Sequence, residues 1–452
     1  MGRVFRLGAM VLILALVSAL ALPTAAGATT FSITQLNTPN GDSEPAISIG
    51  LDGTMAITGL PWLRASAADF ATRLWTGPFG LSPTLRGGID RSLIQAGRTV
   101  LGAEDADVDI GSTGRLHATT LLALVNKPFT AAAFGVSAIT CPSPATPGFS
   151  VSQCTQQIID TTQSDRQWIT SDGPHVYISY HDSAASSLIH VQRSDDDGFT
   201  WRKVGGPIPG QGSATGDATF NNTAGPIVAD PSTHNLYVVY AAGQPSIQKG
   251  TTANFNNVFV SRSTDGGLTW HANLVFHAPF NTRLNNVFPS LAVDPTNGTV
   301  YAVWTDTHGV SVSRSTDQGA TWSASKIVSA SPANTTVQPW VAARNGTVDV
   351  VYYGTSASSN LSLTASWFVY LSNSTNGGTT FGQTQVSPDP NHTGVVCLNG
   401  TGCASGTRNL LDLFEVAIDP QNGKAGIIYT DDAQTTDADG NPLPNLVLAQ
   451  EQ

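Results

Sequence analysis

Apolar and polar positions alternate in a unit that recurs along the whole chain. An extended apolar stretch is followed by a tight polar turn and a second stretch rich in β-branched and aromatic residues, as in FPSLAVDPTNGTVYAVWTD at 288–306. Such a unit predicts a β-hairpin. Seven copies can be counted, with starts between 50 and 75 residues apart: 44–60, 107–122, 166–182, 225–242, 288–306, 338–354 and 413–431. This spacing fits one four-stranded sheet plus loops for each copy.

A second motif follows several of the hairpins. The pattern S-x-D-x-G-x-T-W occurs three times in full and once with Asn and Phe replacing Asp and Trp. Its carboxyl or amide oxygen can accept turn N–H groups, its Gly can adopt positive φ, and its aromatic ring can pack on the sheet. We therefore predict a structural role for these residues: Ser194, Asp196, Gly198, Thr200, Trp201, Ser263, Asp265, Gly267, Thr269, Trp270, Ser315, Asp317, Gly319, Thr321, Trp322, Ser374, Asn376, Gly378, Thr380 and Phe381.

The second motif resembles the Asp-box, or bacterial neuraminidase repeat (BNR), of sialidase-like β-propellers. This resemblance implies an all-β ring of four-stranded antiparallel blades. Seven hairpins predict seven blades, with the six-bladed architecture of sialidases proper as the alternative. Asp-boxes also occur in propellers that hydrolyse nothing, so the motif implies the fold without implying catalysis.

The two ends of the repeat region predict how the ring closes. After the seventh hairpin the chain has one further good strand, NLVLA at 445–449, so that blade lacks its outermost strand. The segment FSITQL at 31–36 is extended and precedes the first hairpin. We expect it to complete the last blade and remove two open sheet edges.

Composition narrows the classes of function. The chain has 452 residues, of which 12% are charged, and its formal net charge is -11. An acidic chain with so few charges has no basic surface for nucleic acid. Hydrophobic residues make up 40% and are evenly spread, which argues against disorder.

The first residues and the cysteines indicate export. Arg3 and Arg6 precede an apolar stretch and a small-x-small site at 26–28, which predicts a secretory signal peptide over 1–28 and a single propeller domain over 29–452. Losing the two arginines takes the charge from -11 to -13. No later segment is long and apolar enough to span a membrane. Cys141 with Cys154 and Cys397 with Cys403 predict two local disulfides, whereas a zinc site would use other spacings.

Strand direction predicts which face carries a site. If the first strand of each blade descends, the hairpin turns and the Asp-boxes lie on the bottom face. Residues before the first strand and after the second strand then lie on the top face, where loops converge on the axis. This set contains Glu104, Asp107, Asp165, His308 and Asp432 together with the ten residues named next. Candidate catalytic acids are Asp182, Asp306, Asp412, Glu415 and Asp431, and candidate substrate-binding residues are Arg166, Arg283, Arg408, His181 and Glu44.

Clustered acids near an axis can raise one another's pKa and act as an acid/base or nucleophile pair. Three arginines in one class of loop could clamp a carboxylate. The alternative is structural: polar residues at strand ends cap backbone groups or form ion pairs, and Arg166 and Asp182 could simply pair with each other.

The resemblance implies an arginine triad, a Tyr activated by Glu, and an Asp acid/base. The Arg-Ile-Pro motif of that family is missing, because the corresponding position reads Glu44-Pro45-Ala46, and no Tyr stands at a clear strand start. Two functions remain open. One is a secreted, exo-sialidase-like glycoside hydrolase acting on extracellular glycans; the other is a non-catalytic extracellular propeller that binds a glycan or a protein. We expect a monomer without cofactor or metal.

Overall fold

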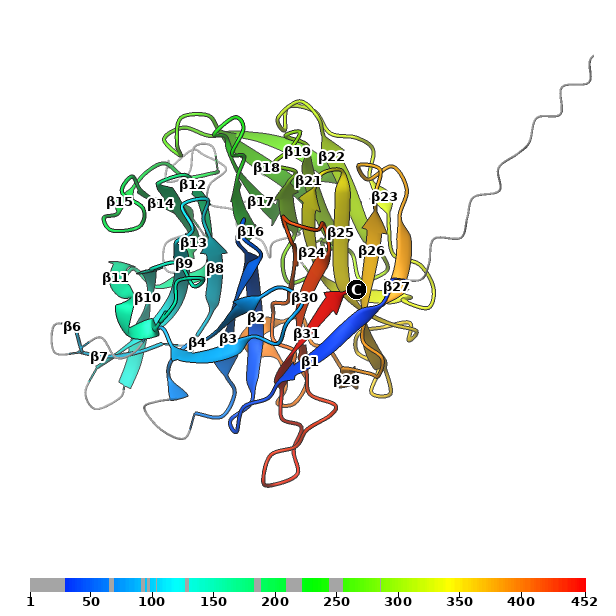
Figure 1. Cartoon of the computed structure of the whole chain (residues 1–452). Helices are drawn as coiled ribbons and strands as arrows, with labels where there is room; N and C mark the ends of the chain where they lie inside the picture. The colour runs from blue at the N-terminus through cyan, green and yellow to red at the C-terminus, as the bar shows by residue number, and fades with distance from the viewer. Residues whose placement is uncertain are drawn as a thin grey trace, which may run out of the picture.

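The computed structural model describes residues 29–64, 69–90, 94–95, 98–102, 104–126, 130–182, 188–208, 222–243, 255–284 and 286–452. The predicted signal peptide lies outside this range. The described residues form strands joined by turns, with two short 3-10 turns at Val151–Gln153 and Gly400–Gly402. Seven sheets stand side by side in a ring (Figure 1). The protein is therefore a seven-bladed β-propeller, as predicted, and the six-bladed alternative is wrong.

Each blade is an antiparallel sheet whose first strand faces the axis. Blade 1 contains β2 (Asp42–Ile49), β3 (Thr54–Pro61), β4 (Arg73–Pro78) and β5 (Thr84–Gly88). Blade 2 contains β8 (Ala106–Ile110), β9 (Leu116–Asn126), β10 (Thr130–Cys141) and β11 (Thr155–Asp160). Blade 3 contains β12 (Ser164–Asp172), β13 (His175–Asp182), β14 (Leu188–Ser194) and β15 (Arg202–Lys203). Blade 2 also carries β6 (Ile94–Gln95) and β7 (Arg98–Leu101), because the long strand β9 pairs with both β8 and β7.

Blades 4 to 7 follow the same order. Blade 4 contains β16 (Asn222–Ala229), β17 (Leu236–Ala242), β18 (Asn257–Ser263) and β19 (His271–His277), and blade 5 contains β20 (Ser290–Val293), β21 (Val300–Thr305), β22 (Val310–Ser315) and β23 (Lys326–Ile327). Blade 6 contains β24 (Thr335–Arg344), β25 (Thr347–Thr355), β26 (Ser366–Ser374) and β27 (Gly382–Gln385), with β28 (His392–Thr393) beside β26. Blade 7 contains β29 (Glu415–Ile418), β30 (Ala425–Asp431) and β31 (Asn445–Glu451).

The last blade takes its outer strand from the other end of the chain. Strand β1 (Phe31–Leu36) pairs antiparallel with β31, from Phe31 opposite Glu451 to Leu36 opposite Leu446. In Figure 1 the blue strand β1 lies beside the red strand β31. This is the pairing that the sequence predicts, and it places both ends of the described chain in one sheet.

The Asp-box turns are held by their own side chains. In the second copy, Ser263 Oγ donates to Asp265 Oδ1 at 2.8 Å and accepts from the Gly267 N–H at 2.9 Å. Asp265 accepts from the backbone and hydroxyl of Thr269, and Trp270 Nε1 donates to the Gly267 carbonyl. Gly267 has φ of 89°, which only glycine adopts without strain. The other three copies use the same Ser and Asp or Asn bonds.

The inner strands present an unpaired edge to the axis, and neighbouring blades satisfy it. Backbone N–H groups of one inner strand donate to side chains of the preceding one. The observed pairs are Ile47 N to Glu415 Oε2, Ile110 N to Ser48 Oγ, Ile169 N to Asp107 Oδ2, Ala229 N to Thr170 Oγ1 and Val341 N to Ser290 Oγ, over 2.8 to 3.3 Å. A buried N–H group without a partner would cost free energy, so these polar residues hold adjacent blades together.

The hydrophobic core lies between blades, where each sheet packs on the next. One cluster joins blades 6 and 7 through Val351, Trp367, Phe414 and Tyr429, all almost fully buried. Both predicted disulfides are present, Cys141–Cys154 and Cys397–Cys403, so the zinc alternative is wrong. No helix in the described part of the chain is long and apolar enough to cross a membrane.

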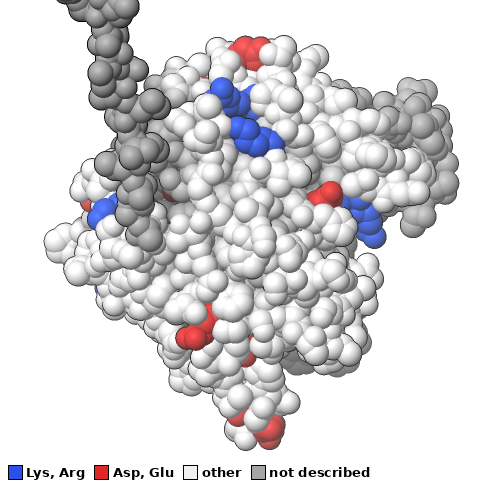
Figure 2. Space-filling view, turned by 90° about the vertical axis from the view of Figure 1, so that its right-hand side faces the viewer, with Lys and Arg blue, Asp and Glu red and all other residues white. Residues whose placement is uncertain are grey.

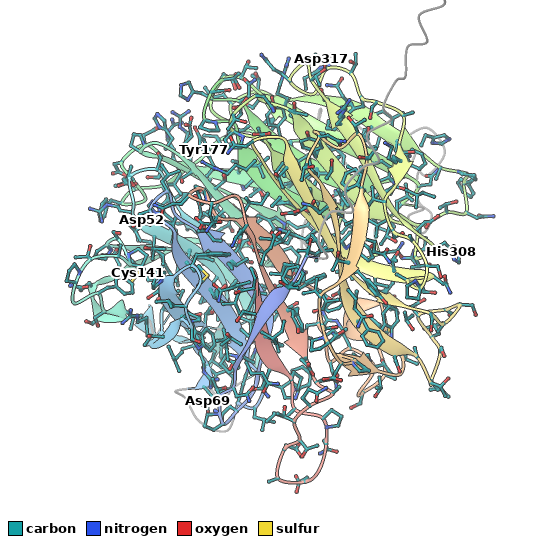
Figure 3. All side chains as sticks on the ribbon, turned by 45° about the vertical axis from the view of Figure 1, so that its right-hand side comes forward. Asp52, Asp69, Cys141, Tyr177, His308 and Asp317 are labelled. Carbon is teal, nitrogen blue, oxygen red and sulfur yellow. A yellow bond between two sulfur atoms is a disulfide. The ribbon has the colours of Figure 1, made fainter. Side chains whose placement is uncertain are left out.

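The two faces of the ring are those expected from strand direction. Figure 3 places Asp52, in the β2–β3 turn, and Asp317, in an Asp-box, on one side, and His308, in the β21–β22 turn, on the other. We call these the bottom and top faces. Charged side chains are few and scattered on the side of the molecule shown in Figure 2.

Candidate functional site

The top face contains a cavity of about 750 Å³. All three predicted substrate-binding arginines, Arg166, Arg283 and Arg408, line it, together with Glu44. They come from loops and strand starts of different blades, which the ring brings around the axis. The remaining wall includes Trp62, Arg64, Glu104, Asp105, Asp165, Phe255, Asn399 and Leu411.

Arg166 is the centre of a buried ion cluster beneath this cavity. Its Nη1 donates to Glu44 Oε1 at 3.2 Å and to Asp105 Oδ1 at 3.0 Å, and its Nη2 donates to Asp412. Arg408 donates to the same Asp412, with Nε 3.2 Å from Oδ1. The Asp412 backbone N–H also donates to Glu44 Oε1 at 3.1 Å. Four blades are therefore joined through one guanidinium group.

The backbone turns these side chains toward the axis. Glu44 and Arg166 have φ of 50° and 53°, and Gln338 in blade 6 has φ of 52°. Each stands at a break in the pairing register between the first and second strands of its blade. A β-bulge re-aims a side chain, and positive φ in a non-glycine residue costs about 1–3 kcal/mol. The surrounding contacts must offset this strain.

Burial and charge determine the protonation of the cluster. Burial raises the pKa of Glu44 and of Asp105, and Arg166 offsets part of that effect. Burial alone would lower the pKa of Arg166, but Asp105, Asp412 and Glu44 together raise it well above its ordinary value. Burial therefore favours the protonated forms of Glu44 and Asp105.

An aromatic layer forms the floor of this region. The Arg166 guanidinium lies 4.8 Å from the centre of the Phe288 ring. Trp168 packs against Phe288 and Trp340, with ring centres 5.6 and 5.3 Å away. Phe288 lines a smaller top-face hollow of about 240 Å³, whereas Trp340 lines a channel that opens on the bottom face. The aromatic layer therefore lies between the top-face hollow and the bottom-face channel.

The smaller hollow lies beside the main cavity and shares Asp165 and Arg166 with it. Further polar residues of its wall are His181, Asn222, Thr223 and Asp412. Burial lowers the pKa of His181, so its imidazole is neutral at neutral pH. His181 therefore lines a top-face hollow beside the ion cluster.

Two further arginines border the main cavity. Arg64 pairs with Glu104 at 2.7 Å. Arg283 is exposed, and its guanidinium lies 5.9 Å from the centre of the Phe255 ring. No carboxylate of the described residues lies within ion-pair distance of Arg283, whereas Arg166 and Arg408 are both occupied by acids of the protein itself.

The five predicted catalytic acids are not brought together. Asp412 belongs to the ion cluster. Glu415 faces the bottom channel, where its Oε2 accepts from the Ile47 N–H. Asp182 lies 3.2 Å from His190 Nε2, Asp306 caps the N–H groups of its own turn, and Asp431 caps the Ala433 N–H. Burial raises the pKa of Asp431 to about 7. Catalytic roles for these acids stay predictions.

Sequence reasoning missed Asp105 and the partners of Arg166. The suggested Arg166–Asp182 ion pair is wrong, because Arg166 bonds instead with acids from three other blades. Asp105 comes directly before β8, at the place in blade 2 that Glu44 and Arg166 occupy in blades 1 and 3. Aligning the seven strand starts residue by residue would have identified it.

Comparison with known proteins agrees with this fold. Residues 147–352 match the family model described as a BNR repeat-like domain. No curated protein matches the chain. The blades, the Asp-box turns and this match support a sialidase-like BNR-repeat β-propeller.

Solved structures of similar shape include enzymes acting on glycans. An ulvan lyase bound to -[GlcA(1-4)Rha3S]- has a TM-score of 0.52 and 12% identity, covering 92% of this chain and 95% of its own. The arabinofuranosidase of Fusarium graminearum has a TM-score of 0.46 and 11% identity, covering 93% and 98%. Trypanosoma rangeli sialidase has a TM-score of 0.46 and 14% identity, covering 94% and 57%. At 12% identity the likeness to the ulvan lyase concerns the fold alone.

Proposed function

We propose that this protein recognises an anionic glycan outside the cell, in the top-face cavity. The single observation that carries the proposal is that the acids beneath the cavity are all in ion pairs. Glu44, Asp105 and Asp412 pair with Arg166, and Asp412 pairs with Arg408 as well. Carboxylates held in this way position a site, whereas a hydrolase needs a pair facing its substrate. This arrangement favours the binding hypothesis over the hydrolytic one.

Arg283 is the residue that we expect to meet the ligand. Its guanidinium borders the cavity without a carboxylate partner among the described residues, beside the apolar ring of Phe255. A planar guanidinium binds carboxylate or sulfate groups through two parallel hydrogen bonds. An aromatic ring next to it offers a flat apolar surface to a sugar.

The volume of the cavity, about 750 Å³, supports a small oligosaccharide ligand. The two disulfides support an oxidising, extracellular compartment. Secretion through the segment 1–28 is part of the proposal.

The test is a binding measurement on purified protein. Acidic and neutral oligosaccharides are screened on an array, and binders are measured by calorimetry. We expect acidic sugars to bind and Arg283→Ala to weaken them by about tenfold or more, since a charged hydrogen bond contributes roughly 1.5–3 kcal/mol. Arg202→Ala, on the outer strand β15, is the matched control. Equal affinity in Arg283→Ala and wild type would contradict the proposal.

Hydrolysis is the second candidate, and one observation favours it. Glu44 and Asp105 border the cavity with raised pKa values, as a general acid requires. Chromogenic glycosides, sialosides included, test it. Turnover that disappears in Asp412→Asn but persists in Asp306→Asn would establish hydrolysis at the ion cluster. Asp182→Asn tests a further acid, at the end of β13. Binding without turnover of any glycoside would support recognition alone.

A further inference from the structure

The bottom face has a second cavity that the proposed function does not use. It is an axial channel of about 380 Å³, lined by the inner strands of the blades. Its walls are mixed: Ile47, Ile169, Ile227 and Val341 are among the apolar residues, and Asp109, Thr170 and Asp172 are among the polar ones. The aromatic layer of Trp168, Phe288 and Trp340 separates it from the top-face cavity. A ligand here would bind independently of the glycan.

The inner end of the channel carries two acids without a cationic partner. Glu415 is 3% exposed, and while its Oε2 accepts from Ile47 N at 2.8 Å, its Oε1 is buried with no hydrogen-bond partner in the described structure. Asp107 accepts from the N–H groups of Val108 and Ile169, both at 2.8 Å. No Lys or Arg of the described residues forms an ion pair with either acid. Burial raises the pKa of Glu415 well above its ordinary value and that of Asp107 to about 7, so a cation that donates to Glu415 Oε1 would bind with release of a proton from this carboxyl pair.

The outer end carries a group of the opposite sign. Arg344 lines the channel, and its Nε is buried with no hydrogen-bond partner among the described residues. Arg344 is the last residue of β24, whereas Glu415 is the first residue of β29, a strand of 4 residues. At a rise of about 3.3 Å per residue, the 4 residues of β29 extend over roughly 10 Å.

We propose that this channel binds a linear ω-amino acid, a ligand with an ammonium group at one end, a carboxylate at the other and an apolar chain between them. The ammonium would donate to Glu415 Oε1 beside Asp107, the carboxylate would accept from Arg344, and the chain would lie against the isoleucine and valine walls. A chain of about six carbons, with one hydrogen bond at each end, is the ligand length that we propose for this channel.

Other ligands fit the channel less well. A metal ion needs several oxygen ligands, and the described residues contain no group of three His, Cys, Asp or Glu placed to hold one. A purely apolar ligand would bury Glu415 and Arg344 without partners, which carries a desolvation penalty. A simple anion is disfavoured because the inner end of the channel presents the acids Asp107 and Glu415.

The test uses 6-aminohexanoate as the probe and calorimetry as the measurement. Hexylammonium and hexanoate each lack one charged end, and we expect each to bind about tenfold more weakly or worse. Glu415→Gln keeps an acceptor for Ile47 N but cannot ionise to meet the ammonium group, and we expect it to weaken 6-aminohexanoate binding about tenfold. Arg344→Met, at the outer end, should also weaken 6-aminohexanoate binding about tenfold, and it leaves the hydrogen bond from Ile47 N to Glu415 Oε2 unchanged.

The control variant is Arg283→Ala, which changes the top-face cavity and should leave 6-aminohexanoate binding unchanged. Thermal melting shows whether each variant is folded. The proposal is overturned if the wild type does not bind 6-aminohexanoate, if hexylammonium binds equally well, or if Arg344→Met, shown to be folded, binds like wild type. Loss of glycan binding in Arg283→Ala with unchanged 6-aminohexanoate binding would support both sites separately.

Discussion

At the scale of single residues, Arg166 organises the top face. Its guanidinium is the common partner of acids from blades 1, 2 and 7, at sequence separations of 122, 61 and 246 residues. Sequence reasoning placed Arg166, Glu44 and Asp412 on this face but assigned the arginine to a substrate carboxylate. The protein's own carboxylates occupy it instead, which is why Arg283 becomes the stronger candidate for ligand contact.

Removing this arginine should destabilise the fold. Arg166→Met leaves Glu44, Asp105 and Asp412 buried with only Arg408 nearby. Breaking a buried pair by removing one partner costs about 3–5 kcal/mol, and we expect a loss of that size in urea unfolding. Arg202→Met is the control, because Arg202 pairs with Asp195 on the surface and such pairs contribute about 1 kcal/mol or less. Similar losses in both variants would contradict this account.

A buried acid should make stability depend on pH. Asp349 lies opposite Asn373 and accepts from its Nδ2 at 2.6 Å, and burial raises its pKa from 3.8 to about 7. Between those values the folded carboxyl keeps a proton that the unfolded one has lost. The free energy of unfolding therefore falls as pH rises from about 4 to about 7, by up to about 1.4 kcal/mol per pH unit for one group.

Asp349→Asn cannot ionise, so its unfolding free energy should fall less than that of the wild type over this range. Urea unfolding at pH 4, 5, 6 and 7 measures both slopes. Other buried acids with raised pKa, such as Asp42 and Asp107, remain in both proteins and cancel in the comparison. Parallel slopes would show that Asp349 ionises normally in the folded state.

At the scale of elements, polar side chains of the inner strands form hydrogen bonds with the inner strand of a neighbouring blade. Ser48, Thr170 and Ser290 lie in inner strands, and each accepts an N–H from the next blade. A propeller leaves the axis-facing edge of each first strand open, and these side chains satisfy it. Their spacing along the chain gives no hint of this role, because donor and acceptor lie in different blades.

The Asp-box provides the element-scale prediction. Ser263 is almost fully buried, and Ser263→Ala leaves the buried Gly267 N–H without its acceptor. We expect a loss of about 1–3 kcal/mol in urea unfolding. Leu268→Ala in the same turn is the control, since Leu268 is 53% exposed and its truncation should change stability little. A loss no larger than that of the control would mean that the turn does not depend on the serine.

At the scale of the whole molecule, the pairing of β1 with β31 joins the chain ends in one sheet. Leu36 of β1 packs in a core cluster with Leu446 and Leu448 of β31 and with Ile57 of blade 1. The N-terminal strand therefore supports two neighbouring blades.

Deleting residues 30–36 should lower the melting temperature and promote association, because the edge of β31 becomes available to other chains. Thermal scanning with light scattering measures both effects. Ile33→Ala, at a position 37% exposed in the same strand, should leave the protein monodisperse. A deletion variant that melts like wild type would show that the outer strand is dispensable.

The sequence by itself determined the number of blades, the Asp-box turns, the outer strand of the last blade, both disulfides and the face on which most candidate residues lie. All of these depend on local alternation, turn chemistry or short spacings. The tertiary structure alone decided that Asp105 and Asp412 converge on Arg166, that Glu415 turns to the bottom channel, and that Arg283 borders the cavity without an acid. Those contacts depend on the angle and height at which separate blades meet around the axis, and no local pattern encodes either quantity.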